Sequence, residues 1–141
     1  MAKTILLAVD IGNEETSRAP LAAALDLLHD GGVLHVITVM PDFGLPQVSG
    51  FFPEGYEKKA HAKILESLKD WIRRHAPEGI ETHAHVGHGT IYDQVLKAAD
   101  KYDVDVIVIG SHRPALKDYL LGPNAARVVR HARQSVYVAR S

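Results

Sequence analysis

The chain has 141 residues, enough for a substantial core, and we expect residues 1–141 to form a single domain. Its 46% hydrophobic and 23% charged residues are typical of a globular protein, and its formal charge of −1 argues against non-specific nucleic-acid binding. Because there is no cysteine, disulfides, thiolate nucleophiles and cysteine zinc sites are excluded. No apolar run approaches the roughly 20 residues that cross a bilayer, and residues 1–10 do not resemble a secretory leader, so we expect a cytoplasmic protein without a membrane partner.

The first half of the chain alternates predicted strands and helices. Short aliphatic runs predict strands, and apolar residues at helical spacing predict helices. The expected order is a strand over 4–9, a helix over 15–29, a strand over 33–40, a loop over 41–55 and a helix over 57–75. We expect Asp30-Gly31-Gly32 to end the first helix. Phe43, Phe51 and Phe52 in the loop suit either packing on the domain or a lid or partner surface.

The second half continues the same alternation. Residues 80–86 alternate between apolar and polar side chains, which predicts a half-exposed strand at a sheet edge. We expect Gly87-His88-Gly89 to form a turn and Thr90 to cap a helix that carries Ile91 and extends to Tyr102. A strand over 103–109, a helix over 125–131 and a strand over 136–139 complete the prediction.

This alternation predicts an α/β fold of the doubly wound, Rossmann-like type. Right-handed crossovers between strands produce a parallel sheet, and five strands suit the order 3-2-1-4-5 with about four helices. In that order strands 1 and 4 are neighbours, and ligands bind at the carboxyl ends of the strands where the topology reverses. Asp10 and Gly110 follow these two strands, so we expect them to converge on one crevice.

The stretch around Gly110 carries the clearest functional signal. A Val- and Ile-rich strand opens through Gly110, where a missing Cβ lets a ligand approach the main chain. The chain then leads through Gly122 to a predicted helix, whose N-terminus is suited to a phosphate. Asp10 suits either the capping of the following turn or a contact to a ribose hydroxyl or metal-bound water. The residues alone leave both roles of Asp10 open.

Several segments resemble the universal stress proteins. They are Ile109-Gly110-Ser111-His112, Leu120-Leu121-Gly122, the first strand at 5–10 and Ser135-Val136-Tyr137-Val138, so the resemblance runs from Lys3 to Arg140. Ser-His-Arg-Pro with Tyr-Leu-Leu-Gly resembles one bacterial subgroup.

The resemblance implies a stress-response or regulatory protein that binds ATP or another adenine nucleotide, with or without Mg²⁺ on the phosphates, and that has no catalytic residues. It implies that Val36 contacts adenine through its backbone and that the turn at Gly87 lies near the nucleotide. The complete implied site consists of Val9, Asp10, Val36, Gly87, Gly110, Ser111, His112, Arg113, Gly122, Pro123, Asn124 and Ala125.

The chain departs from the family pattern near the phosphates. Many members carry Gly-x-x-Gly, nine residues, and then Gly-Ser or Gly-Thr. Here Arg113 replaces the second glycine, eight residues separate it from Gly122, and Pro123 replaces the Ser or Thr. Pro123 removes a hydroxyl and a backbone donor, whereas Arg113 adds a forked cation that suits a phosphate or is a solvated loop charge. We expect phosphate binding to persist with altered contacts.

Other polar groups give weaker signals. His83 and His85 share a strand face, but a metal site needs a third ligand, and no metal site is predicted. Ser111 and His112 are close to Asp10, yet neighbours in sequence do not make a catalytic triad. The chain has neither a Gly-x-Ser-x-Gly elbow nor a Gly-Lys-Ser phosphate loop, so we identify no catalytic residue.

The last strand predicts self-association. Val136, Tyr137 and Val138 fall on a sheet edge in the expected order, and family members pair this strand across a twofold axis, so we expect a homodimer. Three functions stay open. They are an ATP-binding regulatory protein, a nucleotide-free homodimeric module that binds an unknown protein partner, and a slow hydrolase or phosphotransferase without an identifiable base.

Overall fold

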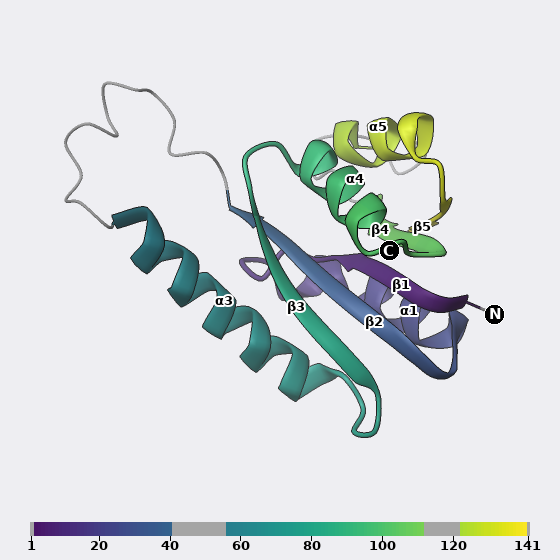
Figure 1. Ribbon diagram of the computed structural model, residues 1–141, viewed down its shortest axis with the longest axis horizontal. Helices are drawn as coiled ribbons and strands as arrows, with labels where there is room; N and C mark the ends of the chain where they lie inside the picture. The colour runs from purple at the N-terminus through teal and green to yellow at the C-terminus, as the bar shows by residue number, and fades with distance from the viewer. Residues whose placement is uncertain (1, 41–55, 112–121, 141) are drawn as a thin grey trace.

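A five-stranded parallel sheet forms the centre of the protein (Figure 1). The computed structural model describes residues 2–40, 56–111 and 122–140. The strands are β1 (Ala2–Ala8), β2 (Leu28–Met40), β3 (Glu81–His88), β4 (Val106–Gly110) and β5 (Ser135–Ala139). Their spatial order is β3-β2-β1-β4-β5, which confirms the predicted order 3-2-1-4-5.

Helices cover both faces of the sheet, as Figure 1 shows. In the described part of the chain they are the 3₁₀ turn η1 (Glu14–Ser17) and the α-helices α1 (Arg18–Leu27), α3 (Tyr56–His75), α4 (Ile91–Lys101) and α5 (Pro123–His131). Residues of α1 and α3 pack with Leu7 on one face, and residues of α4 and α5 pack with Leu6 on the other. Adjacent residues in a strand point to opposite faces, so the uninterrupted apolar run in β1 is buried from both sides.

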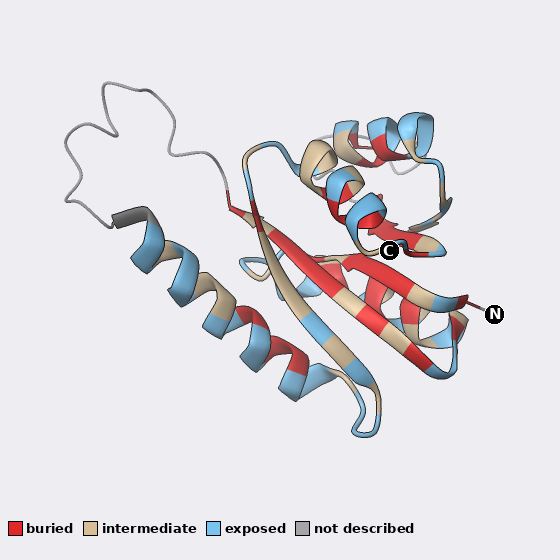
Figure 2. Cartoon of the chain, in the orientation of Figure 1, coloured by how far each residue is buried: buried red, intermediate tan, exposed pale blue. Residues whose placement is uncertain are grey.

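The two sheet edges differ from the centre in burial (Figure 2). β3 is half-buried or exposed over most of its length, in agreement with the predicted half-exposed edge strand. β5 forms the opposite edge, and its Tyr137 is 46% exposed. Within the described ranges, none of the helices has the length and apolar character needed to span a membrane.

The first helix is shorter than predicted. The predicted single helix over 15–29 is instead a 3₁₀ turn followed by α1, which ends at Leu27. Leu28 already pairs with Ala2 of β1, so the sheet ends the helix before the glycines. Gly31, at φ 81°, lies in the irregular segment between that pair and the regular ladder that starts at Val33.

Two further boundaries differ from the prediction. Strand β4 starts at Val106 rather than at residue 103, because Asp103 adopts a left-handed turn (φ 50°) after α4. Strand β3 extends to His88, so Gly87 belongs to the strand and not to a turn. The predicted loop over 41–55, with its three phenylalanines, lies outside the described residues.

Candidate functional site

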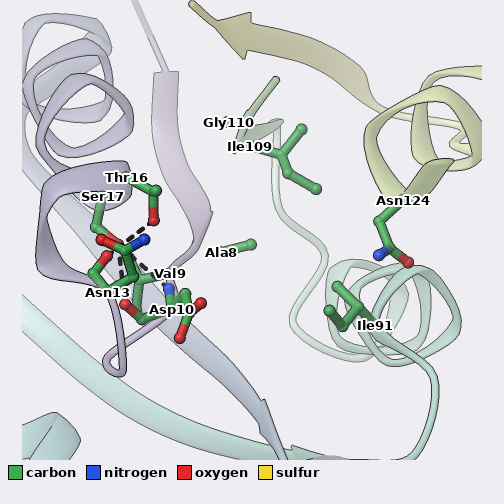
Figure 3. Close-up of a pocket in the computed structure, with 10 residues that line it drawn as sticks. All are labelled: Ala8, Val9, Asp10, Asn13, Thr16, Ser17, Ile91, Ile109, Gly110 and Asn124. Atoms are coloured by element: carbon green, nitrogen blue, oxygen red, sulfur yellow. Dashed lines mark hydrogen bonds between the residues drawn. The ribbon is translucent and has the colours of Figure 1, made fainter. Parts of the chain in front are cut away.

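A crevice lies at the carboxyl ends of β1 and β4, where the direction of the topology reverses (Figure 3). Its volume is about 310 Å³, at the lower end of the range for small-molecule sites. The lining residues come from four segments that are distant in sequence: Ala8, Val9, Asp10, Asn13, Thr16, Ser17, Ile91, Ile109, Gly110 and Asn124. The sheet order therefore brings Asp10 and Gly110 to one cavity, as expected from the sequence.

The turn after β1 forms one wall of the crevice. One carboxylate oxygen of Asp10 accepts the Gly12 N–H at 2.9 Å, so Asp10 caps its own turn. The Asp10 N–H donates to the Ser17 hydroxyl oxygen at 3.2 Å, and the Thr16 hydroxyl donates to the Asn13 carbonyl at 2.8 Å. These bonds hold the Asp10 carboxylate at the crevice, so its capping role and a ligand-binding role are compatible.

Asn124 stands on the opposite wall, across the crevice from Asp10 (Figure 3). Its side-chain oxygen accepts the Tyr92 N–H at 3.2 Å, which satisfies one of the free donors at the start of α4. Thr90 occupies the predicted N-cap position but makes no side-chain capping bond. The first turns of α4 and α5 are thus joined by Asn124, and the start of α5 is directed towards the crevice.

A second hollow adjoins the first along β2. It has a volume of about 390 Å³ and shares Ala8, Val9, Asp10 and Ile91 with the crevice. Its other lining residues are Ile37, Thr38, Val39 and Gly89. Ile91 is 42% exposed, and it borders both hollows. The site therefore consists of an apolar part beside β2 and a more polar part between Asp10 and Asn124.

The described side chains that line the two hollows are mostly apolar or neutral polar. Among the described residues that line them, Asp10 is the sole ionisable side chain. A general acid and a general base would need two such groups in reach of one substrate. Across residues 2–40, 56–111 and 122–140, no three or more His, Asp or Glu side chains are grouped so as to hold a metal ion.

Comparison with known proteins gives the family. Residues 1–140 match the sequence profile described as the universal stress protein family. Universal stress protein G of Escherichia coli O157:H7 is 32% identical to this chain over 142 residues, covering 99% of this chain and 100% of that protein. The chain belongs to the universal stress protein family.

Solved universal stress protein structures share this fold. The protein from Archaeoglobus fulgidus in complex with dAMP has a TM-score of 0.63 and 22% identity, covering 99% of this chain and 98% of its own. A universal stress protein in complex with cAMP has a TM-score of 0.69 and 18% identity, covering 99% and 97% of the two chains. The fold class inferred from strand and helix alternation is confirmed.

The structure brings four of the site residues implied by the universal stress protein resemblance to the crevice: Val9, Asp10, Gly110 and Asn124. Val36 does not line either hollow, because its side chain lies on the face of the sheet that packs against α1 and α3. The expected contact between its backbone and adenine stays a prediction. On β2 the lining residues are instead Ile37, Thr38 and Val39.

The other described residues of the implied site do not line either hollow. Gly87 is in β3, where an added Cβ would lie 2.9 Å from the Gln94 Cβ, whereas Gly89, at φ 122°, lines the second hollow. Ser111 is buried, and its N–H donates to the Ala139 carbonyl at 3.0 Å.

The segment that leads into α5 is only partly described. Gly122 is the N-cap of α5 and Pro123 its first residue, with Ala125 buried beneath it. His112 and Arg113 lie outside the described residues.

Sequence reasoning missed the contributions of η1 and of Ile91, and within the expected turn it named Gly87 where Gly89 lines the second hollow. Thr16 and Ser17 line the crevice, and Ile91 and Gly89 line the second hollow. The sequence did contain a signal for Ile91, because it is a large apolar residue at the first position of α4, directly after the turn that contains Gly89. The signal for Thr16 was hidden by the prediction of one continuous helix from residue 15.

Proposed function

We propose that this protein binds ATP or another adenine nucleotide and acts as a regulatory protein, through its nucleotide-dependent state or through partner binding. The observation that carries the proposal is the two-part site at the carboxyl ends of β1 and β4, apolar on one side and polar on the other. Universal stress proteins of the same fold have been solved with dAMP and with cAMP, which supports an adenine nucleotide as the ligand class.

Each part of the nucleotide has a suitable environment in this arrangement. The apolar hollow beside Ile37 and Ile91 suits a base, which gains from removal of its faces from water. Asp10, which borders both hollows, is positioned for a ribose hydroxyl. The crevice between Gly110 and Asn124 then receives the phosphates, at the positive end of the α5 dipole.

The phosphate end differs from the common family pattern in a way that the helix tolerates. Pro123 is the first residue of α5, where its missing N–H would have had no partner inside the helix. The backbone donors of Asn124 and Ala125 remain near the start of α5. We propose that Arg113 supplies the cation that this altered sequence needs, and that Mg²⁺ accompanies the phosphates.

The expected role is binding without a dedicated hydrolytic step. Asp10 is the sole ionisable side chain among the described residues of the two hollows, and its Oδ1 already accepts the Gly12 N–H. A reaction that needs a positioned base and a separate acid has no pair of groups there. We therefore propose a nucleotide-responsive regulator rather than an ATPase.

Calorimetric titration of the purified protein with ATP, ADP and AMP tests the proposal. The variant Asp10→Asn keeps the side-chain oxygen that caps the turn and removes the charge, so its fold should be retained. We expect Asp10→Asn to weaken all three ligands by about tenfold, the lower end of what a charged hydrogen bond contributes. The matched control Asp26→Asn, on the exposed side of α1, should leave binding unchanged.

The absence of saturable binding for all three nucleotides at millimolar concentration would contradict the proposal and favour the second candidate. That candidate is a nucleotide-free homodimeric module, supported by the edge position of β5 and by the 46% exposure of Tyr137. An exposed strand edge is a template for pairing with another chain. A homodimer through β5 is also compatible with nucleotide binding, so the titration and not the oligomeric state separates the two candidates.

A further inference from the structure

An aromatic and histidine cluster lies on the β2–β3 edge of the sheet, outside the proposed nucleotide site. It consists of His35 on β2, Glu81, His83 and His85 on β3, and Lys101 and Tyr102 at the end of α4. The His35 ring stacks on His83 and Tyr102, with centroid distances of 5.1 and 4.7 Å. The His85 ring stacks on Tyr102 at 4.2 Å. The cluster therefore joins three elements through ring contacts.

One hydrogen bond in this cluster depends on protonation. Nδ1 of His35 lies 2.8 Å from Nε2 of His85, so one of these nitrogens donates a proton to the other. The pair tolerates one additional proton on an outer ring nitrogen. A second additional proton would make both facing nitrogens donors, and the bond would be lost.

We propose that the His35–His85 pair is an acid-sensitive latch that holds the edge strand β3 and the end of α4 to β2 at neutral pH and releases them on acidification. The inference does not depend on nucleotide binding, because none of these side chains lines the two hollows.

The charges around the pair oppose its protonation. Burial lowers the pKa of His85 to about 4, helped by His35, His83 and Lys101 nearby. Burial and His83 also lower the pKa of His35, and Glu81 opposes this only in part. The Glu81 carboxylate instead bonds to His83 at 2.7 Å. No compensating carboxylate is bonded to the facing nitrogens of His35 and His85 in the described part of the chain.

The direction of the pH effect follows from these shifts. A histidine with a lowered pKa in the closed state binds a proton more readily after opening, where its ordinary value is 6.5. The latch is therefore stable above about pH 6.5 and weakens as the pH falls towards 4. For an opening that fully exposes His85, linkage predicts about a thirtyfold rise in the open population at pH 5. Because His85 is already partly exposed, we expect about tenfold.

The latch is connected to the rest of the sheet through strand register. His85 pairs with Ile37 on β2, and Ile37 lines the second hollow. The chain after β3 passes through Gly89 to Ile91, which both line that hollow as well. Release of β3 would therefore also loosen one wall of the site.

Hydrogen exchange measured by mass spectrometry at pH 7.5 and pH 5.0 tests the latch, with rates corrected for the intrinsic effect of pH. We expect protection of peptides covering Glu81–His88 to fall about tenfold at pH 5.0, while peptides covering Arg18–Leu27 keep their protection. His85→Phe retains a ring and removes the titrating group, and His85→Gln remains neutral while keeping polar atoms. Both variants should lose the extra exchange at pH 5.0.

One control variant and two possible outcomes test whether the His35–His85 pair causes the acid sensitivity of β3. His131→Gln changes an exposed histidine on α5, outside the cluster, and should behave as the unmodified protein. Equal loss of protection in β3 and α1 would show global acid unfolding and overturn the proposal. An unchanged tenfold fall in both His85 variants would overturn it too, because the effect would then arise from other groups.

Discussion

Ile91 offers a direct test of where the base binds. Its side chain is 42% exposed although it borders both hollows, so a bound base would cover surface that is otherwise in water. Full burial of an isoleucine contributes about 1.5–3 kcal/mol, and two fifths of that is about 0.6–1.2 kcal/mol. Ile91→Ala should therefore weaken AMP and ATP alike by about three- to tenfold.

The same calorimetric titration measures this effect, with chemical denaturation to check the fold. Alanine is favourable in a helix and the lost surface is exposed, so the free energy of unfolding should change little. The matched control is Val129→Ala on α5, which removes a side chain that is 47% exposed and that lines neither hollow. Unchanged affinity for both nucleotides in Ile91→Ala would refute the placement of the base, and a loss for ATP alone would place the phosphates there instead.

Three further predictions concern stability, assembly and phosphate recognition. A Cβ at Gly32 would lie 2.7 Å from the Lys3 carbonyl oxygen, so Gly32→Ala should lower the free energy of unfolding in urea by more than about 2 kcal/mol. At Gly79 a Cβ would meet open space, so Gly79→Ala should lower it by only about 1 kcal/mol, the cost of φ 89° for a residue with a side chain. The Ala139 carbonyl accepts from Ser111 on the β4 side, so in the alternation along β5 the Val138 N–H faces the open edge. Val138→Pro removes that donor and should shift a homodimer towards monomer in light scattering; a monomeric starting protein would contradict the dimer. Arg113→Ala should weaken ATP roughly ten- to a hundredfold and AMP much less, and equal losses would indicate general damage to the loop.

The fold was predictable because two patterns alternate along this chain: short aliphatic runs, which indicate strands, and apolar residues at helical spacing, which indicate helices. Apolar runs such as Ile5-Leu6-Leu7 are too short for helices and too continuous for a half-exposed strand, so they indicate strands covered on both faces. Long-range pairing decided two of the boundaries that were predicted wrongly, the end of the first helix and the end of β3. Leu28 is compatible with the end of a helix, and its pairing with Ala2 is what makes it part of β2.

The site was predictable to the level of strand ends and not to the level of side chains. Because parallel strands end at one edge, Asp10 and Gly110 had to approach one another once the order was known. Which β2 side chains reach the cavity depends on how they alternate between the two faces of the sheet, and this alternation places the Ile37 side chain, and not that of Val36, on the α4 side at the hollow. The role of Asn124 in capping α4 depends on a contact between residues 32 positions apart, which local sequence patterns do not contain.

Backbone hydrogen bonds define the shape of the site, which we call its frame, whereas side chains supply the proposed ligand contacts. Backbone bonds that fix the frame, from Val9 N–H to the Ile37 carbonyl and from Ser111 N–H to the Ala139 carbonyl, leave the side chains at the crevice free to vary. The substitutions that distinguish this chain from the common family pattern, Arg113 and Pro123, both fall in the segment where the family resemblance implies the phosphates. The β2 end of the site contains none of these departures. Recognition of the base and recognition of the phosphates should therefore vary independently, and comparison of AMP with ATP resolves the two contributions in a single protein.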